Sequence, residues 1–498
     1  MTALPAQPVV YEVNTRVWLR EIALRTGRPT GLGDVPKDVW DEITPSGVDA
    51  VWLMGVWERS PQGRAIALEN PQLRTAFSTA VPDASDEDIA GSPYCIRRYE
   101  VDAALGGAAG LVTARTELDR RGVGLLLDYV PNHVAPDSPW AGEHPEYFVR
   151  GDTEDLRRDP AGFLDTGRAV LARGRDPFFP PWPDVVQLNA FAPELRRATA
   201  HLLGHIGRFC DGLRCDMAML LMNDVFARTW GERVGPAPAE DFWPEVVSEV
   251  RREHPRLIFA AEAYWDLEWA LQQQGFDFCY DKRLYDRLLN ESPEAVRGHL
   301  RADEEYQRRL VRFLENHDEP RAARTLDPAK ERAAATLIAT LPGATLWHEG
   351  QFTGRRVHLP VFLDRRPEEP ADAPLRSFHE RLLSSVHGSG MRTGRWQLLD
   401  CEGWSDNASG RDLIASCWTG PAGRFLTVVN LSAHPAQARV RLPWTELLGP
   451  DTWELLDVLG SGRYERRGAD LLESGLYVDL PPWGSHVLSV VSGSPAVS

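Results

Sequence analysis

The sequence lacks the features that define three common classes of protein. None of its apolar runs approaches the about 18 residues that a membrane-spanning helix needs. Its first residues, MTALPAQPVVYEVNTRVWL, lack the positively charged start and unbroken apolar core of a secretory signal. Its six cysteines form no CxxC pair and show no metal-ligand spacing. We therefore expect no membrane association, reduced and buried thiols, and a cytoplasmic location.

Basic residues are also in deficit. The chain has 55 Lys and Arg against 72 Asp and Glu, a formal net charge of −17. Because nucleic-acid binding depends on basic patches, we predict no nucleic-acid partner. Apolar residues are abundant, at 43% of 498 residues and including 17 Trp, which is enough for a large core. The composition leaves the oligomeric state open.

Eight short β-like runs occupy the first 385 residues, separated mostly by amphipathic segments long enough to form helices. This alternation predicts an α/β fold, a (β/α)8 TIM barrel. A doubly wound open sheet is the alternative, but no Gly-rich phosphate turn follows the first strand. The predicted strands are residues 9–13, 49–54, 124–130, 212–217, 257–262, 276–281, 311–316 and 344–349.

Two long segments, 56–100 and 133–193, interrupt the repeat, and we expect them to be irregular loops that wall a cleft at the strand C-termini. After about residue 390, short strands with Gly, Pro and Asn turns predict an antiparallel β-sandwich. The predicted division is a catalytic barrel (1–132 and 194–388), a short inserted domain after the third strand (133–193) and a C-terminal β-sandwich domain (389–498).

Acidic residues end several of the predicted strands. In a β/α barrel the strand C-termini converge on one face, so these side chains point toward a common site. Glycoside hydrolysis needs two carboxyl groups in different environments, one ionised as nucleophile and one protonated as acid. The candidates are Asp128 with Asn132 and His133, Asp216, Glu262, and Asp318 with His317.

Two charges interrupt the apolar stretch GLRCDMAML, residues 212–220. Arg214 and Asp216 are costly in such a strand unless they are paired or used. Because they are two residues apart on a strand, they share one face. The arginine would favour the ionised form of the carboxylate and fix its orientation.

Each candidate also has a structural interpretation. A single Asp or Glu at a strand end is more often a helix cap or salt-bridge partner, while His133 fits a core histidine and His317 a turn residue. A metal site is a further alternative, because histidine and carboxylates suit several metals. Its ligands would be Asp128, His133, Glu262, His317 and Asp318. The convergence of several strands on one face favours a catalytic site over these readings.

The motifs resemble those of the α-amylase family, the retaining glycosidases of glycoside hydrolase family 13, across nearly the whole chain. Four motifs are similar to those of the family's third, fourth, fifth and seventh strands: DYVPNH (128–133), GLRCD (212–216), AAEAYW (260–265) and FLENHD (313–318). Further similar segments are GSPYCIRRY (91–99), VVQLNAFAPELR (185–196), and the C-terminal VVNLS and LPPWGSHVL.

The resemblance implies a glycosidase that cleaves α-glucosidic bonds of short oligosaccharides or glucosides through a covalent glycosyl-enzyme. It implies that Asp216 is the nucleophile and that Glu262 is the general acid and then the base. Asp318 would stabilise the oxocarbenium-like sugar. The retaining mechanism predicts that the carboxyl groups of Asp216 and Glu262 are about 5–5.5 Å apart.

The resemblance also assigns substrate-binding residues. Arg214 would orient Asp216, and the sugar at the cleaved bond would be held by Tyr94, Asp128, His133 and His317. No cofactor is required. Asn132 is a calcium ligand in some relatives and marks a candidate site for a structural Ca²⁺ ion, whose binding is left open.

The sequence departs from the family after the nucleophile. Members that cut starch-like polymers often carry a Lys-His pair there, where this chain has Met219 and Leu220. A Met-Leu pair is typical of core packing, and its presence weakens a polymer-cleaving function. The alternative functions are a transglycosylase, isomerase or phosphorylase, similar to trehalose synthase or sucrose phosphorylase, and an inactive binding protein. The presence of all three acids disfavours the last.

For two further groups of residues, both a substrate-binding role and a structural role are open. Glu349 and Gln351 follow the eighth strand, where they either contact substrate or hold the loop. Phe178, Phe179 and Trp182 either stack on sugars or pack the inserted domain.

Overall fold

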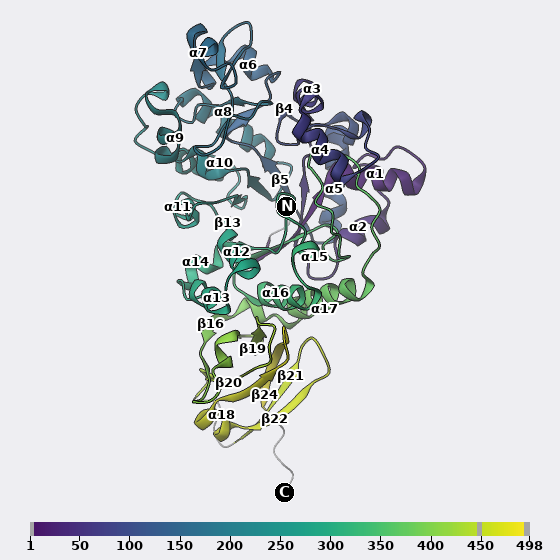
Figure 1. Ribbon diagram of the computed structural model, residues 1–498, viewed down its shortest axis with the longest axis vertical. Coiled ribbons are helices and arrows are strands. Elements are labelled where there is room, and N and C mark those ends of the chain that lie inside the picture. Colours follow the sequence, from purple (N-terminus) through teal and green to yellow (C-terminus); the bar gives the residue numbers. More distant parts are fainter. Residues whose placement is uncertain (1–3, 446–450, 493–498) are drawn as a thin grey trace.

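The computed structural model describes residues 4–445 and 451–492. Figure 1 shows three parts along the long axis. The segment with α6 and α7 is at the top, the barrel and its helices are in the middle, and the C-terminal strands are at the bottom.

Eight parallel strands close into a barrel in the order β1-β15-β14-β13-β12-β11-β5-β2. The fold class and all eight predicted strands are confirmed, with ends that differ by a few residues. The strands are β1 Val9–Asn14, β2 Ala50–Met54, β5 Gly124–Tyr129, β11 Gly212–Cys215, β12 Ile258–Ala261, β13 Phe278–Tyr280, β14 Leu310–Arg312 and β15 Ala344–His348.

Two strands end earlier than predicted for identifiable reasons. β11 stops at Cys215, because Met217 adopts a left-handed conformation with φ 42°. β14 stops at Arg312, four residues early, and a turn follows in which the Asn316 side chain accepts hydrogen bonds from the backbone N–H groups of Asp318 and Glu319. Both acidic motifs therefore lie on loops just beyond the strands.

Helices cover the outside of the barrel (Figure 1). The strands are buried on both faces, which explains their nearly unbroken apolar sequences. The helices of this part are α1 Thr15–Thr26, α2 Lys37–Ile43, α3 Pro61–Glu69, α4 Pro71–Ala80, α5 Gly107–Arg120, α8 Pro193–Ile206, α9 Asn223–Trp230, α10 Phe242–Glu253, α11 Glu268–Gln273, α12 Lys282–Asn290, α13 Pro293–His299, α14 Glu304–Arg308, α15 Ala322–Thr325, α16 Pro328–Thr340 and α17 Ala373–Ser389.

The prediction that residues 56–100 form an irregular loop is wrong. This segment contains β3 Trp57–Arg59 paired with β4 Ile96–Val101, and the helices α3 and α4 between them. Both helices begin with a proline in the first turn, and Ser60 and Asn70 cap them through their side chains. These start signals were present in the sequence.

Residues 133–193 also contain regular structure. β6 pairs with β10, and β7, β9 and β8 form a three-stranded sheet. The elements are β6 His133–Val134, α6 Pro139–Glu143, β7 Arg150–Gly151, α7 Thr153–Arg158, β8 Phe163–Asp165, β9 Val170–Ala172 and β10 Val186–Gln187. The expectation of an irregular loop is wrong here too, because each of these strands is only two or three residues long and gives little periodic signal.

The C-terminal part contains two antiparallel sheets that share an apolar core, as predicted. The Trp418 indole N–H donates to the Thr340 carbonyl of α16 at 2.7 Å and joins this part to the barrel. The strands are β16 Arg395–Leu399, β17 Cys401–Glu402, β18 Leu413–Gly420, β19 Gly423–Asn430, β20 Ala436–Val440, β21 Thr452–Asp457, β22 Arg463–Arg467, β23 Leu476–Leu480 and β24 Ser485–Ser492, with one helix, α18 Gly468–Ser474.

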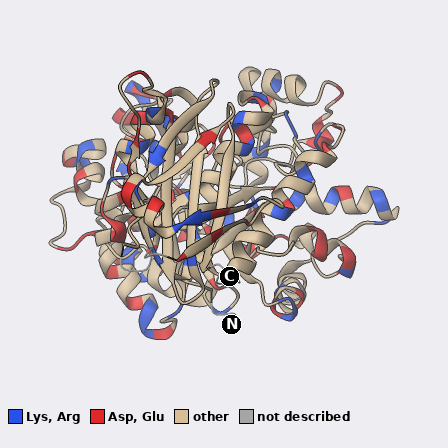
Figure 2. Cartoon of the chain, turned by 90° about the horizontal axis from the view of Figure 1, so that it is seen from below, with Lys and Arg blue, Asp and Glu red and all other residues tan. Residues whose placement is uncertain are grey.

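Three expectations from composition can be compared with the structure. All six cysteines are free thiols, and all except the half-buried Cys401 are buried. Within residues 4–445 and 451–492, no helix is long and apolar enough to cross a membrane. Figure 2 shows acidic and basic positions interspersed along the helices when the molecule is viewed from the C-terminal end.

Candidate active site

Arg214 occupies the centre of the candidate site. It lies on β11 in the barrel interior and is only 1% exposed. Its Nη1 donates a hydrogen bond to Asp216 Oδ1 at 2.7 Å. Its Nη2 forms an ion pair with Glu262 Oε2 at 2.8 Å but makes no hydrogen bond. Asp128 Oδ1 lies 3.8 Å from Nη1. One guanidinium group therefore bridges two acids and faces a third.

The strand register produces this arrangement. Arg214 pairs with Asp128 on one side and with Ala260 on the other, while Cys215 pairs with Ala261. Asp216 and Glu262 each follow these paired residues directly, so they leave adjacent strands at the same height.

Glu262 has two further donors. The Met217 N–H donates to its Oε2 at 2.7 Å, and the Tyr264 hydroxyl donates to its Oε1 at 2.9 Å. The left-handed conformation of Met217 accompanies this contact. Tyr264 was not predicted as a site residue, although it belongs to the quoted AAEAYW motif.

Met219 and Leu220 do not belong to the site. They lie in the short 3-10 helix η4 Ala218–Leu221, whose residues are all buried in the main hydrophobic core. The packing interpretation of this pair is therefore correct.

Asp318 joins the group through His317. His317 Nε2 lies 3.1 Å from Asp318 Oδ2 and is hydrogen-bonded to the Tyr94 hydroxyl at 2.7 Å, while its Nδ1 binds Glu12. Glu12 is fully buried on β1 and was also missed. A charge inside the apolar run VVYEV was the available signal, as it was for Arg214.

Burial and neighbouring charges separate the acids chemically. Burial, together with the charges of Asp216 and Asp318, raises the pKa of Glu262 to about 7 against the opposing effect of Arg214. Burial also raises the pKa of Asp216, but the Arg214 charge and hydrogen bond counteract it. Of these two neighbouring carboxyl groups, Glu262 is therefore the one that is more readily protonated.

The pKa values of the other ionisable groups at the site are also shifted. Removal from water opposes ionisation of Asp318, but the charge of His317 and its hydrogen bond outweigh it and hold the pKa of this carboxyl below its usual range. Burial lowers the pKa of His317, yet Asp318 and Glu12 raise it well above its ordinary value. Burial raises the pKa of Asp128 to about 6 and lowers that of His133 to about 4.

The structure thus brings most predicted site residues into one contact network. It consists of Tyr94, Asp128, Arg214, Asp216, Glu262, His317 and Asp318. The Arg214 guanidinium lies over the Tyr94 ring, 5.3 Å from its centroid, and so connects the acids with His317. His133 lies on β6 with its ring edge-on to Trp182, at 5.3 Å between centroids. Asn132 pairs with the side-chain amide of Gln187.

Other candidates have structural contacts. Glu349 forms an ion pair with Arg366 at 3.1 Å, and Gln351 accepts a hydrogen bond from the His348 N–H, so both hold their loop. Phe178 and Phe179 are 62% and 68% exposed, and the Phe178 ring is edge-on to Trp265 at 4.9 Å. Trp182 packs against the core.

The metal alternative finds no support in the described part of the chain, where no group of three or more His, Cys, Asp or Glu side chains is arranged to hold an ion. The residues considered as ligands instead bind Arg214 or one another, as in the Glu262 and Asp318 contacts.

A segment that we call the strap, residues 357–366, crosses next to the site. His358 Nε2 donates to the His317 carbonyl oxygen at 2.9 Å. The strap is tied to the loop after β2, since the Ala90 N–H donates to the Phe362 carbonyl at 2.8 Å and Arg365 binds Asp88 at 3.0 Å. The loops that follow β2 and β15 are therefore joined beside His317.

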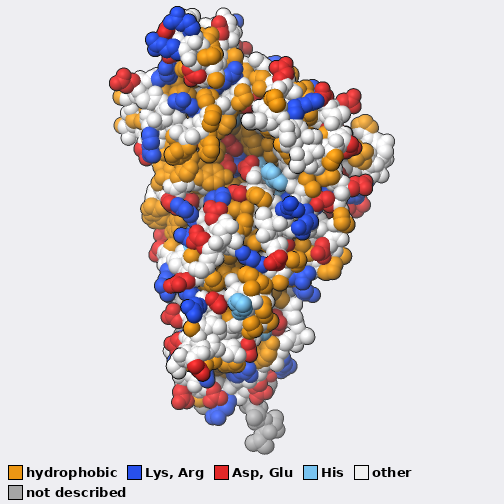
Figure 3. Space-filling view, viewed as in Figure 1, with side chains coloured by type: hydrophobic (Ala, Val, Ile, Leu, Met, Phe, Trp, Pro, Cys, Tyr) orange, Lys and Arg blue, Asp and Glu red, His pale blue; other side chains and the backbone are white. Residues whose placement is uncertain are grey.

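Figure 3 shows a hollow on the face seen in Figure 1, below the inserted segment, with acidic, histidine and hydrophobic side chains around it. Within the catalytic candidates, the Asp318 side chain is the most exposed of the three acids, at 44%.

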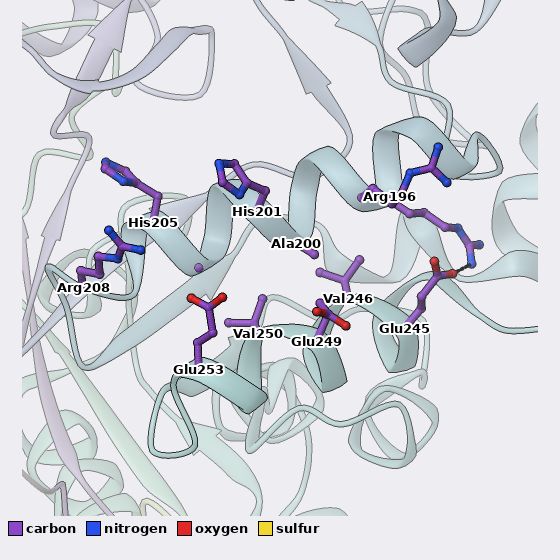
Figure 4. Close-up of a pocket in the computed structure, with 12 residues that line it drawn as sticks. Arg196, Ala200, His201, His205, Arg208, Glu245, Val246, Glu249, Val250 and Glu253 are labelled. Carbon is purple, nitrogen blue, oxygen red and sulfur yellow. Dashed lines mark hydrogen bonds and ion pairs between the residues drawn. The ribbon is translucent and has the colours of Figure 1, made fainter.

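A separate groove of about 570 Å³ lies between α8 and α10 (Figure 4). Basic side chains of α8 face acidic side chains of α10 across it, and Arg196 forms an ion pair with Glu245 at 2.7 Å. None of the predicted site residues lines this groove.

The chain is similar to known proteins in sequence and in fold. No protein-family model matches the chain. α-Amylase MalA of Haloarcula japonica is 25% identical over 478 residues, which cover 93% of this chain and 59% of that protein. The chain thus spans about three fifths of the length of this curated relative.

Solved structures match over nearly the whole chain. The maltogenic α-amylase AmyB of Thermotoga neapolitana has a TM-score of 0.69 at 20% identity, covering 98% of this chain and 99% of that one. The Geobacillus thermoleovorans α-amylase complexed with acarbose has a TM-score of 0.67 at 17% identity, covering 99% and 100%. At these identities the structures establish the fold.

Proposed function

We propose, from the premise that this chain has the fold and the motif order of the α-amylase family, that it is a retaining glycosidase. It would hydrolyse α-glucosidic bonds of short oligosaccharides or glucosides through a covalent glycosyl-enzyme. The observation that carries the proposal is the buried Arg214 guanidinium, whose two terminal nitrogens contact the carboxyl groups of Asp216 and Glu262.

Each acid has a role that its surroundings favour. Asp216, ionised by its bond to Arg214, attacks the anomeric carbon. Glu262, with a pKa of about 7, donates its proton to the leaving oxygen and then takes a proton from the incoming water. Asp318 remains ionised beside His317 and stabilises the positive charge that develops on the sugar ring.

The sharing of one guanidinium group supports a retaining rather than an inverting reaction. Retaining enzymes place the two carboxyl groups about 5–5.5 Å apart, whereas inverting enzymes need about 6.5–9.5 Å to admit a water molecule. Carboxylates on the two terminal nitrogens of one arginine are held near each other.

The position of the strap favours short substrates. Since it joins the loops after β2 and β15 beside His317, it limits the space into which a sugar chain can extend from that side of the site. The buried Met219 and Leu220 supply no polar contact for leaving sugars. We therefore propose disaccharides, short oligosaccharides or glucosides rather than long polymers.

The second candidate is transfer to a sugar hydroxyl or to phosphate instead of water, as in a transglycosylase, isomerase or phosphorylase. The exposed ring of Phe178 against Trp265 favours it, because Trp265 is only three residues from the acid Glu262 and an apolar ring face at this place suits a sugar acceptor.

One experiment separates these candidates. Purified protein is incubated with maltose, trehalose, sucrose, isomaltose, maltooligosaccharides and an aryl α-glucoside, with and without phosphate, and the products are followed by NMR. Free glucose that appears first as the α-anomer supports retaining hydrolysis. A rearranged disaccharide or a sugar phosphate supports transfer, and first-formed β-glucose contradicts retention.

Three further parts of the interpretation are also proposals. These are the cytoplasmic location, which the free cysteines support, the division into barrel, inserted and C-terminal domains at residues 133–193 and 389, and a reaction without an added cofactor. The strand pattern supports the domain division, since the sheets of each part are separate.

A further inference from the structure

Gln187 is a fully buried side chain at the junction between the barrel and the inserted segment. It lies on β10 and pairs with His133 of β6, directly after the end of β5. Its side chain contacts Asn132, the residue that the family resemblance offers as a calcium ligand.

Three oxygen atoms converge on the Gln187 side-chain nitrogen. Nε2 lies 2.9 Å from the Asn132 carbonyl oxygen, 2.9 Å from Asn132 Oδ1 and 3.0 Å from the Leu188 carbonyl oxygen. An amide nitrogen carries only two hydrogens, so the three acceptors share them. The NH₂ group of the amide, which carries its partial positive charge, thus faces all three oxygen atoms.

Backbone groups fix the orientation of this amide. Two of the three acceptors are carbonyl oxygens, which cannot donate, so Nε2 must face them. On the other side, Oε1 accepts from the Arg175 backbone N–H at 3.3 Å and from Asn132 Nδ2 at 3.2 Å. A rotated amide would place an oxygen against three oxygens and lose every one of these hydrogen bonds.

This donor set does not fit a calcium ion. Calcium takes six to eight oxygen ligands at about 2.3–2.6 Å, usually with carboxylates among them. Here Asn132 Oδ1 already accepts from an amide N–H, and the nitrogen occupies the point where the oxygens meet. Among the described residues, no group of three or more His, Cys, Asp or Glu side chains could hold a metal ion.

We propose that the Gln187 amide takes the place of a structural cation and ties the inserted segment to the barrel without calcium. It links the loop after β5 at Asn132, the loop at Arg175 and β10 in one set of hydrogen bonds. His133, which pairs with Gln187 across the β6–β10 sheet, is thereby held without a metal.

The proposal makes opposite predictions for the wild-type chain and for Gln187→Glu. Glutamate has the same shape, but its carboxylate replaces the donating nitrogen with an oxygen that faces three others. A cation is then needed to bring the four oxygens together. The variant turns a calcium-independent junction into a calcium-dependent one.

The test measures melting temperature with and without calcium. Wild type, Gln187→Glu and the control Gln72→Glu, at an exposed position of α4, are heated in excess EDTA and in millimolar CaCl₂. We expect wild type and Gln72→Glu to melt at the same temperature in both buffers. Gln187→Glu should melt about 5–10 °C lower in EDTA, from the lost hydrogen bonds and the buried charge, and recover much of this in calcium.

The outcomes are decisive either way. A wild-type melting temperature that falls in EDTA overturns the proposal, as does a Gln187→Glu protein that is equally unstable, or equally insoluble, with and without calcium. A variant that is soluble only when calcium is present throughout purification supports it. Because no substrate is added, the result is independent of whether the chain is a glycosidase.

Discussion

The charged side chains around Arg214 at the barrel mouth differ from those in the groove between α8 and α10 in how far they are buried. Around Arg214 the charges are enclosed, with side-chain exposures of 2% for Arg214 and 4% for Glu262. In the groove most charges remain in water, with 68% for Arg197 and 57% for Glu249, although Arg196 is only 2% exposed where it pairs with Glu245. Ion pairs between exposed charges contribute little to stability.

The difference lies in how the charges are partnered. Arg214 contacts Asp216 and Glu262 together and lowers the pKa of both carboxyl groups, against the rise that burial causes. Exposed charges on helices satisfy themselves with water and close neighbours, as Arg252 and Glu249 do one turn apart. Enclosure and a guanidinium shared between two acids distinguish the Arg214 site from the groove.

The largest expected effect is the loss of turnover on changing the acids. Asp216→Asn should lower kcat/KM by about 10⁴-fold or more, since the nucleophile is removed. Glu262→Gln should lower it by about 10²–10⁴-fold on maltose, whose leaving group needs a proton. Hydrolysis rates on maltose measure both.

The matched control is Glu249→Gln in the groove, which makes the same chemical change on an exposed helix and should leave kcat/KM within about two-fold. Wild-type-like turnover in Asp216→Asn, with the melting temperature retained, would remove the basis for the assignment.

The second effect is on the pH profile. Because Glu262 must be protonated to donate, and burial raises its pKa to about 7, kcat/KM should fall as the pH rises through about 7. Below that range the profile should fall again as Asp216 becomes protonated. The rate measured from pH 4 to 9 checks this, and Glu262→Gln should lack the alkaline fall.

Tyr264→Phe should change the same profile by a smaller amount. The tyrosine hydroxyl donates to Glu262 Oε1, and such a bond favours the ionised carboxylate. Its removal should move the alkaline midpoint upward by about one pH unit and lower kcat/KM several-fold. Tyr477→Phe, on an exposed strand of the C-terminal part, is the control. An unchanged midpoint in Tyr264→Phe would show that this hydroxyl does not position the acid.

The smallest expected effect concerns the strap. Asp88→Asn removes the charge that holds Arg20 and Arg365, which should cost about 1–3 kcal/mol of unfolding free energy. With the strap loosened, the ratio of activity on maltoheptaose to activity on maltose should rise a few-fold. Asp83→Asn, whose side chain is 79% exposed beside the same Arg365, should leave the ratio unchanged. An unchanged ratio in Asp88→Asn would mean that the strap does not limit substrate length.

Local sequence patterns were sufficient for the barrel strands and for the residues at their ends. Apolar runs such as GLLLDYV can bury only as strands or core helices, and their lengths favour strands. The loops were misjudged where capping signals at Ser60 and Asn70 were overlooked, and where strands of two or three residues carry no period.

Some contacts at the site join residues that lie far apart in the sequence. Glu12 and His317 meet although 305 positions separate them, and the strap reaches Asp88 from a distance of 277 residues. No local pattern encodes such pairs, because closure of the barrel alone brings the strand ends together.

The sequence by itself therefore determined the barrel and the identity of its strand-end acids, because hydrophobic periodicity and strand direction are local properties. The tertiary structure alone decided how those acids differ. It placed one guanidinium between two of them, a histidine beside the third, and an amide where the oxygens of the inserted segment converge. These contacts depend on burial and on distances between strands, and both arise only when the chain is folded.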